Sequence, residues 1–336
     1  MQNNNGHAIF VIGPTASGKT AFAHRLADQL WQQFNIPCGL VNLDAFQFYR
    51  GVDLGTAKPS PAEVLKYKYR GIDILDATES VDAAGYSEFV HDSCRELNSA
   101  GQMAICVGGS GLYLRSVLHG LDPLPPRNDA LRTMFRASAD AWGWPVLHGW
   151  LEALAPERAA QLHPNDKTRI ERALEIVFGL PDGVAPQQIF KSPKPLAEQD
   201  LRGNFFVFQV DCDDGVLKTR IRSRIDSMFD SGWIAEVKEL KKNYGRSFLD
   251  FQAGKAIGYR EIFEKLDASA TFAAGDDDEN DLALKERISV LTWQYVRRQR
   301  TWNAKEIRHA SFDSSGGIAE IQFDASFLSY ISGYRV

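Results

Sequence analysis

The sequence predicts an α/β fold in which a parallel sheet is flanked by helices and carries a small all-helical insertion domain. Short apolar runs rich in β-branched residues alternate with segments of helical periodicity, which favours a parallel sheet covered on both faces. A glycine-rich segment joins the first apolar run to a helical pattern. A middle stretch, bounded by prolines, has helical periodicity and no convincing strand.

The order of the elements follows from these patterns. The first strand is expected at residues 8–12, and a helical pattern at residues 21–30 follows it after the glycine-rich loop. Further strands are expected at residues 39–43, 103–107 and 205–210. Further helices are expected at residues 86–100, 214–230 and 282–308. Such an alternation is typical of helical crossovers between parallel strands.

The domain boundaries follow the proline-rich segments. Residues 1–120 and 201–310 would form a discontinuous α/β core, and residues 121–200 a helical insertion between two of its strands. Residues 311–336 are assigned to a C-terminal tail for which the sequence indicates no role. The helices of the insertion are expected at residues 129–154 and 166–178.

Residues 13–20 match the phosphate-loop pattern G-x-x-x-x-G-K-[ST], with a strand before them and a helix after them. In this context backbone N–H groups converge on phosphate oxygens, and the helix N-terminus adds about half a positive charge. Lys19 would neutralise the terminal phosphates, and the Thr20 hydroxyl would ligate Mg²⁺. The sheet is therefore expected to be P-loop NTPase-like and to bind a di- or triphosphate. The residues of this site are Gly13, Pro14, Thr15, Ala16, Ser17, Gly18, Lys19 and Thr20.

A carboxylate follows the second apolar run. By parallel-sheet topology Asp44 lies at the carboxyl end of a strand, where open α/β folds bind their ligands. It could be a metal ligand, a general base or a helix cap, and its position alone leaves all three open. The phosphate loop does not determine the type of reaction either, because the same motif occurs in enzymes that transfer a phosphoryl group and in enzymes that hydrolyse one.

Composition excludes some classes of protein. No apolar run approaches the ~18–20 residues that span a bilayer, so no membrane partner is expected, and the first residues do not look like a signal peptide. The four cysteines are widely spaced, which makes a disulfide framework or a metal site a weak interpretation and favours a reduced, cytoplasmic setting. The charge of the chain is unevenly distributed. Although the net charge is −5, residues 285–308 form a basic segment with seven Lys or Arg against two Glu. A monomer is the default expectation.

Six segments together carry a resemblance to a known family. They are G-P-T-A-S-G-K-T at 13–20, D-A-F-Q-F-Y-R-G-V-D-L-G-T-A-K-P at 44–59, V-G-G-S-G-L-Y at 107–113, H-P-N-D-K-T-R-I-E-R-A-L-E at 163–175, Q-A-G-K-A-I-G-Y-R-E at 252–261 and R-R-Q-R-T-W at 297–302. The phosphate loop alone is shared by many enzymes, whereas this combination is highly specific. The chain resembles the tRNA dimethylallyltransferases, or tRNA isopentenyltransferases, of the IPP transferase family.

The resemblance implies a reaction at carbon. The phosphate loop, with Mg²⁺ as cofactor, would hold the diphosphate of dimethylallyl diphosphate as a leaving group, and the nucleophile would be N6 of the adenosine next to a tRNA anticodon. Asp44 matches the family's general base, and Ser110 would place its hydroxyl beside the adenine or the diphosphate. Arg220 and Arg224, four residues apart on one helix face, would bind the diphosphate.

The resemblance also implies that the insertion embraces the anticodon stem-loop of the tRNA. Phosphate contacts would offset the cost of turning the target base out of its stack. The residues expected to contact tRNA are Asp44, Ala45, Phe46, Gln47, Ser110, Arg132, Thr168, Arg169, Ile170, Glu171, Arg172, Lys255, Ala256, Ile257, Gly258, Tyr259 and Arg260.

The chain departs from the family pattern at a few positions. Ala45 stands where Ser is usual, Ser110 where Thr is usual, and Tyr69-Arg70 where a His pair is common. Trp293 and Ala304 occupy positions that are often Arg. Alternatives to tRNA prenylation are an adenylate isopentenyltransferase acting on free nucleotides, a small-molecule P-loop kinase and a non-catalytic RNA-binding relative.

Overall fold

The structure, a computed structural model, describes residues 7–121, 124–190, 204–269, 277–318 and 320–334. The chain divides into two compact units, which are described separately below. One unit comprises Met1–Gly120 and Gln199–Val336, and the other comprises Leu121–Glu198. The expected end of the insertion, residue 200, lies outside the described residues. None of the helices in the described segments is long and apolar enough to span a bilayer.

The first unit is built on a five-stranded sheet with the order β2-β3-β1-β4-β5, in which every neighbouring pair is parallel. The strands are β1 (His7–Ile12), β2 (Cys38–Leu43), β3 (Met103–Gly108), β4 (Asn204–Asp211) and β5 (Ala310–Asp313). The predicted α/β fold with a parallel, P-loop-like sheet is confirmed, and the four expected strands lie within one residue of those observed. The fifth strand was not expected.

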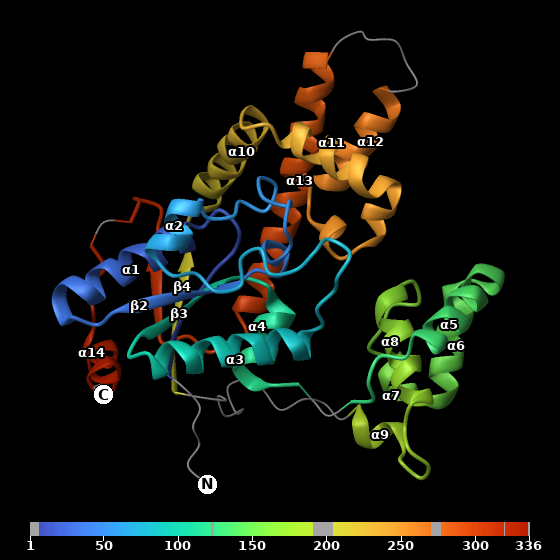
Figure 1. The fold of residues 1–336 in the computed structure, drawn as a ribbon. Helices are drawn as coiled ribbons and strands as arrows, with labels where there is room; N and C mark the ends of the chain where they lie inside the picture. Colours follow the sequence, from blue (N-terminus) through green and yellow to red (C-terminus); the bar gives the residue numbers. More distant parts are fainter. Residues whose placement is uncertain (1–6, 122–123, 191–203, 270–276, 319, 335–336) are drawn as a thin grey trace. The chain divides into compact units, whose positions relative to one another are not determined.

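Both faces of the sheet are buried, as its apolar runs predict. Successive residues of β1 point to opposite faces, so that Phe10 lies in one core cluster and Val11 in another. Helices α3 (Ala83–Ser99) and α4 (Gly111–His119) cover the first face, while α1 (Lys19–Phe34) covers the second (Figure 1). A helical crossover therefore follows each of the first three strands, which sends their carboxyl ends to the same edge.

A helical layer with its own core completes this unit. Trp233, Phe248 and Ile288 are among its buried side chains. Its elements are α10 (Asp214–Asp230), α11 (Trp233–Tyr244), α12 (Tyr259–Ser269), α13 (Asp277–Asn303) and the short 3₁₀ helices at Gly245–Asp250 and Ala253–Lys255. The unit also contains the 3₁₀ helix Ala45–Phe48 and α2 (Pro61–Lys66). The helix expected at residues 282–308 ends five residues earlier, at Asn303, because the chain then turns to enter β5.

The C-terminal segment belongs to the core and is not a separate tail. β5 pairs with β4, and α14 (Ala325–Ser332) places Phe327 and Ile331 in the cluster shared with α1. The Gln29 side chain of α1 exchanges two hydrogen bonds with the backbone of Ile321, at 2.9 and 3.1 Å. This segment therefore closes the face of the sheet that α1 covers only in part (Figure 1).

The second unit is helical throughout its described residues. Its helices are α5 (Asp129–Trp142), α6 (Trp144–Leu154), α7 (Pro156–Ala159), α8 (Lys167–Phe178) and α9 (Pro186–Ile189). The single helix expected at residues 129–154 is two helices, because the chain turns at Gly143, where φ is 85°. Phe135, Leu151 and Leu174 are buried in a core that this unit forms by itself.

Buried carboxylates organise the second unit. Glu175 is only 1% exposed and accepts hydrogen bonds from the backbone N–H of Asn128 and from Arg132 and Arg172. Glu171 is similarly paired with Arg136. Burial by itself raises the pKa of Glu175, but these donors outweigh it and hold the pKa at about 2. Arg132 and Arg172, expected to bind tRNA, thus have a structural role in this unit.

Replacing Glu175 by Gln should destabilise the insertion on the order of 3 kcal/mol at pH 7, since it removes the carboxylate partner of Arg172 and leaves Arg132 only the longer ion pair with Glu171, at 3.7 Å. Because the pKa of Glu175 is depressed from 4.5 to about 2, its stabilising effect is present above pH 4.5 and disappears as the pH falls toward 2. Urea unfolding at pH 7 and at acidic pH measures both effects. The exposed Glu152→Gln change on α6 is the control. Equal free energies of unfolding for the two variants would contradict the structural role of Glu175.

Candidate active site

The phosphate loop forms a tightly packed turn between β1 and α1. A Cβ atom on Gly13 would lie 2.1 Å from the backbone oxygen of Val210 in β4, so that only glycine fits there. The Lys19 ammonium donates to the Pro14 carbonyl at 3.2 Å, across the loop. The loop therefore has the strand–turn–helix geometry that the motif requires, with α1 beginning at Lys19.

Asp44 directly follows β2 and is the N-cap of the short 3₁₀ helix Ala45–Phe48. Its carboxylate accepts a hydrogen bond from the backbone N–H of Phe46 at 3.0 Å. The buried Asn42 side chain fixes its backbone on both sides: Asn42 accepts from the Asp44 N–H at 2.8 Å and donates to the Asp44 carbonyl at 2.8 Å. A further Asn42 bond, to the Gly71 carbonyl, anchors the pair to the neighbouring loop. The carboxylate is thus both a helix cap and a group held in a defined place.

One cavity of about 470 Å³ in the first unit brings the two motifs together. Its polar wall carries Lys19 and Thr20 of the phosphate loop, Asp44, and Arg224 of α10. The other predicted site residues that line it are Thr15, Ala16, Phe46, Gln47, Lys255, Ala256 and Ile257. Apolar side chains form another part of the lining: Ile221, Ile225, Met228, Trp233 and Ile288.

The charged groups of this cavity perturb one another. Burial and the Arg224 charge together lower the pKa of Lys19 to about 8, against the opposing effect of the Asp44 charge. Burial raises the pKa of Asp44, and Lys19, the Phe46 N–H and Arg224 oppose that rise. Burial also lowers the pKa of Arg224. Two cations and one carboxylate, each partly buried in the cavity wall, leave a net positive charge that suits a phosphorylated ligand.

Gln47 presents one end of its amide to a neighbouring loop. Its Nε2 donates to the carbonyl oxygens of Thr56 and Ala57, at 3.1 and 3.4 Å. Because both partners are acceptors, the Oε1 atom is left to accept a hydrogen bond from another group, such as an exocyclic amine. Lys58 closes the same loop: its buried ammonium bonds the Tyr49 carbonyl, Asp53 and Asp73.

Other predicted site residues lie outside the cavity lining. The Arg220 guanidinium donates to Ser314, at 3.0 Å to the hydroxyl and 2.6 Å to the carbonyl, and Ser314 in turn donates to the Ser17 carbonyl at 2.6 Å. Arg220 thus supports the phosphate loop from the side of the C-terminal segment. Ser110 occupies the N-cap position of α4 and interacts with Tyr295, which does line the cavity.

Several predicted tRNA contacts have side chains that are buried or already engaged. Tyr259 is buried and donates to Glu236 at 2.6 Å, and Gly258 packs against Trp233. Ala45 is buried in the core under the sheet. In the second unit Ile170 is buried and Glu171 pairs with Arg136, whereas Thr168 and Arg169 are exposed. Arg260 is also exposed.

Sequence reasoning missed a residue that connects the two halves of the site. The buried Gln299 of α13 accepts from the Thr15 N–H at 2.8 Å and donates to the Gly109 carbonyl at 2.9 Å. The phosphate loop and the turn after β3 are therefore joined by one side-chain amide. The segment R-R-Q-R-T-W contributes to the family resemblance, but the sequence alone does not indicate this role for its glutamine.

Tyr295 and Arg298 of α13 were also not assigned to the cavity, which both of them line. Burial and the nearby Asp44 charge together raise the pKa of Tyr295 to about 12, so its phenol is a neutral hydroxyl at physiological pH. Their spacing along one helix is the signal that would have found them, since Tyr295, Arg298 and Gln299 share a helix face.

Comparison with known proteins agrees with this geometry. The family model described as IPP transferase matches residues 47–306. A tRNA dimethylallyltransferase of Thiobacillus denitrificans is 37% identical over 297 residues, covering 88% of each chain. One of Acidithiobacillus ferrooxidans is 35% identical over 310 residues, covering 92% of this chain and 90% of the relative.

Solved structures have the same fold. The full-length tRNA isopentenylpyrophosphate transferase of Bacillus halodurans is 27% identical, with a TM-score of 0.61 over 98% of this chain and 96% of its own. A eukaryotic dimethylallyltransferase acting on tRNA is 20% identical, with a TM-score of 0.73 over 92% of this chain and 74% of its own, and it supports the fold alone. The family match and the identity to these relatives establish that the chain belongs to the IPP transferase family.

Proposed function

We propose that this chain is a tRNA dimethylallyltransferase, which moves the dimethylallyl group of dimethylallyl diphosphate to N6 of the adenosine next to a tRNA anticodon. One observation carries the proposal: the phosphate loop and Asp44 line the same cavity. A phosphate cradle and a carboxylate in one enclosure supply what an alkyl transfer to nitrogen needs, namely a site for the leaving group and a proton acceptor.

In the proposed reaction the N6 lone pair attacks C1 of the dimethylallyl group. The C1–N6 bond forms, the C1–O bond breaks, and the diphosphate leaves with its electron pair. N6 of adenine is a weak nucleophile because its lone pair is delocalised into the ring, and Asp44 helps by accepting the N6 proton as the bond forms. The raised pKa of Asp44 makes it a stronger base, and the positive charges of Lys19 and Arg224 oppose that rise.

The leaving group would be held by Lys19, Arg224 and the loop N–H groups, whose positive charge stabilises the diphosphate as it departs. Mg²⁺ fits this site: the Thr20 hydroxyl lines the cavity, and magnesium is commonly held by one or two protein groups together with substrate phosphates. Within the described part of the chain, no group of three or more His, Cys, Asp or Glu side chains could hold a metal alone. When bound, the ion would neutralise charge on the diphosphate oxygens.

The apolar lining favours prenyl transfer over a small-molecule kinase. Ile225, Met228 and Ile288 present hydrocarbon to the same cavity as the cations. A dimethylallyl group is apolar and develops positive charge at C1, so a wall that excludes water would protect it from hydrolysis. The phosphate acceptor of a small-molecule kinase is a polar group, which would gain little from contact with hydrocarbon.

The proposal is tested by incubating the enzyme, Mg²⁺ and dimethylallyl diphosphate with unmodified tRNA or with AMP, then digesting the RNA and weighing the nucleosides. The expected product is N6-isopentenyladenosine from the tRNA reaction. Prenylated AMP without prenylated tRNA would assign the chain to the adenylate isopentenyltransferases instead. The cytoplasmic location and the monomeric state stay predictions of the sequence.

The Asp44→Asn variant should lose turnover by at least ~10²-fold, since Asn cannot accept the N6 proton. Its affinity for diphosphate should be retained or rise, because a negative charge beside the phosphate site is removed. Steady-state prenylation and calorimetric titration with inorganic diphosphate measure the two quantities. Asp250→Asn, an exposed position outside the cavity, is the control; wild-type turnover in Asp44→Asn would exclude the general-base role.

The Gln299→Met variant should weaken diphosphate binding by about tenfold. It removes two buried hydrogen bonds, each with a net value of about 1 kcal/mol, and leaves the Thr15 N–H free to move. Titration with inorganic diphosphate measures the change, and Gln33→Met, which removes one exposed hydrogen bond from α1, is the matched control. If the two variants bind diphosphate equally well, Gln299 does not position the loop.

A further inference from the structure

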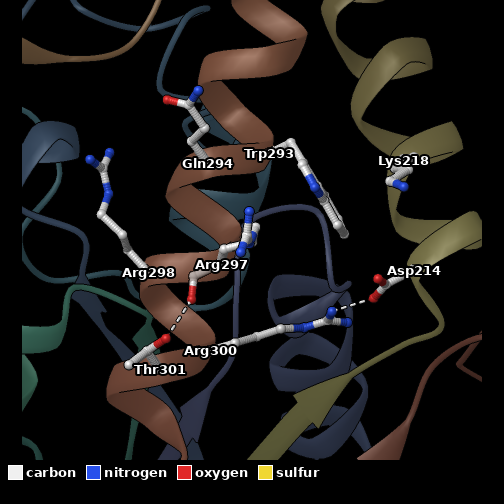
Figure 2. A pocket seen from close by; sticks show the side chains of 8 residues that line it. All are labelled: Asp214, Lys218, Trp293, Gln294, Arg297, Arg298, Arg300 and Thr301. Atoms are coloured by element: carbon white, nitrogen blue, oxygen red, sulfur yellow. Dashed lines mark hydrogen bonds and ion pairs between the residues drawn. The ribbon is translucent and has the colours of Figure 1, made fainter.

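A second hollow of about 730 Å³ lies between α10 and α13 (Figure 2). We call it the α10–α13 groove. It is lined by Asp214, Lys218, Trp293, Gln294, Arg297, Arg298, Arg300 and Thr301. Arg298 lines both this groove and the cavity that holds Asp44 and the phosphate loop. A ligand in the groove would therefore reach toward the reaction site from outside.

The groove is positive although the chain as a whole carries a net charge of −5. Asp214 is its one acidic lining residue, and it forms an ion pair with Arg300 (Figure 2). Arg300 also pairs with Asp211 at 2.9 Å, so these three side chains together keep one negative charge. Among the described residues, no carboxylate forms a salt bridge with Lys218, Arg297 or Arg298; the Lys218 ammonium and the Arg298 guanidinium each lie over an aromatic ring. Lys218 lies close enough to Asp214 to lower the pKa of that carboxyl, so part of the remaining negative charge faces this cation. The cations of the lining still outnumber the carboxylates, and this excess on an acidic protein indicates a polyanionic ligand.

Trp293 gives the groove a flat apolar surface. Its indole stands on α13 facing Lys218 of α10, whose ammonium lies 4.8 Å from the ring centroid (Figure 2). Lys218 is exposed, so its ammonium can leave the ring for a phosphate at little cost. An aromatic ring bordered by cations is the arrangement with which proteins bind single-stranded nucleic acid: bases stack on the ring and phosphates contact the cations.

We propose that the α10–α13 groove binds a nucleotide of the RNA substrate next to the target adenosine, with its base on Trp293 and its phosphates at Lys218 and Arg297. The proposal rests on the proposed function, since it needs RNA as the substrate. Arg298 favours RNA over an acidic protein partner, because a side chain shared by groove and cavity connects the occupant of the groove to the molecule that reacts.

The test compares Lys218→Glu and Arg297→Glu with Arg222→Glu, an exposed charge reversal on α10 outside the groove. For prenylation of unmodified tRNA, each groove variant should lose about tenfold or more in kcat/KM, and the slope of log kcat/KM against log salt should fall by about 1 per lost phosphate contact. KM for dimethylallyl diphosphate should stay at the wild-type value. Arg222→Glu should behave as the wild type in all three measurements.

Base stacking is tested separately at Trp293. Trp293→Ala should lower kcat/KM for tRNA by about tenfold with an unchanged salt slope, and Trp293→Phe should restore most of it, because a ring of either kind stacks. Thermal unfolding of both variants shows whether the half-buried position still folds. Stacking is supported if Trp293→Phe recovers kcat/KM while the Trp293→Ala and Trp293→Phe variants unfold at the same temperature.

The outcomes separate this inference from the proposed function. If the wild type does not prenylate tRNA, the proposed function fails whatever the variants do. If the wild type is active and the groove variants match Arg222→Glu, the groove does not bind the RNA. An unchanged salt slope with a lower kcat/KM would also overturn the inference, since it would place an uncharged partner, such as a protein surface, in the groove.

Discussion

The active site depends on the close approach of the loops that leave neighbouring strands at one edge of the sheet. A Cβ atom on Gly109, after β3, would lie 2.2 Å from the carbonyl oxygen of Gly13, and a Cβ atom on Gly13 would collide with β4. These loops therefore meet backbone to backbone, without intervening side chains. Gln299 adds an amide that satisfies one polar group on each loop, so that their separation is set by hydrogen bonds as well as by contact.

The electrostatics of the cavity follow from this packing. Burial disfavours the charged forms of Lys19, Arg224 and Asp44 alike. In the proposed complex, a diphosphate in the loop would add negative charge next to all three and would raise the pKa values of Lys19 and Asp44. The Lys19 ammonium would then be favoured against the leaving group, and the basicity of the Asp44 carboxylate toward N6 would increase.

Much of the fold could be predicted because its signals are local. The apolar runs, the phosphate loop and Asp44 after β2 each lie within a short stretch of chain, and the structure places them as expected. The features that could not be predicted depend on contacts between residues far apart in the sequence. The bond between Thr15 and Gln299 joins residues 284 positions apart, and β5 has four residues with too little pattern to be recognised. Sequence also does not show the carboxylate that Arg132 and Arg172 meet or the serine that Arg220 meets, so their structural contacts were not predicted; their roles in binding tRNA and diphosphate stay predictions.

The most direct measurement is a structure of the enzyme with a non-reactive thiolo analogue of dimethylallyl diphosphate and an unmodified anticodon stem-loop. The account predicts the diphosphate on the loop of residues 13–20, the dimethylallyl group against Ile225 and Met228, and N6 of the turned-out adenosine at hydrogen-bond distance from Asp44, about 2.6–3.2 Å. An adenosine that enters the cavity with N6 facing away from Asp44, or a diphosphate bound outside the loop, would contradict it.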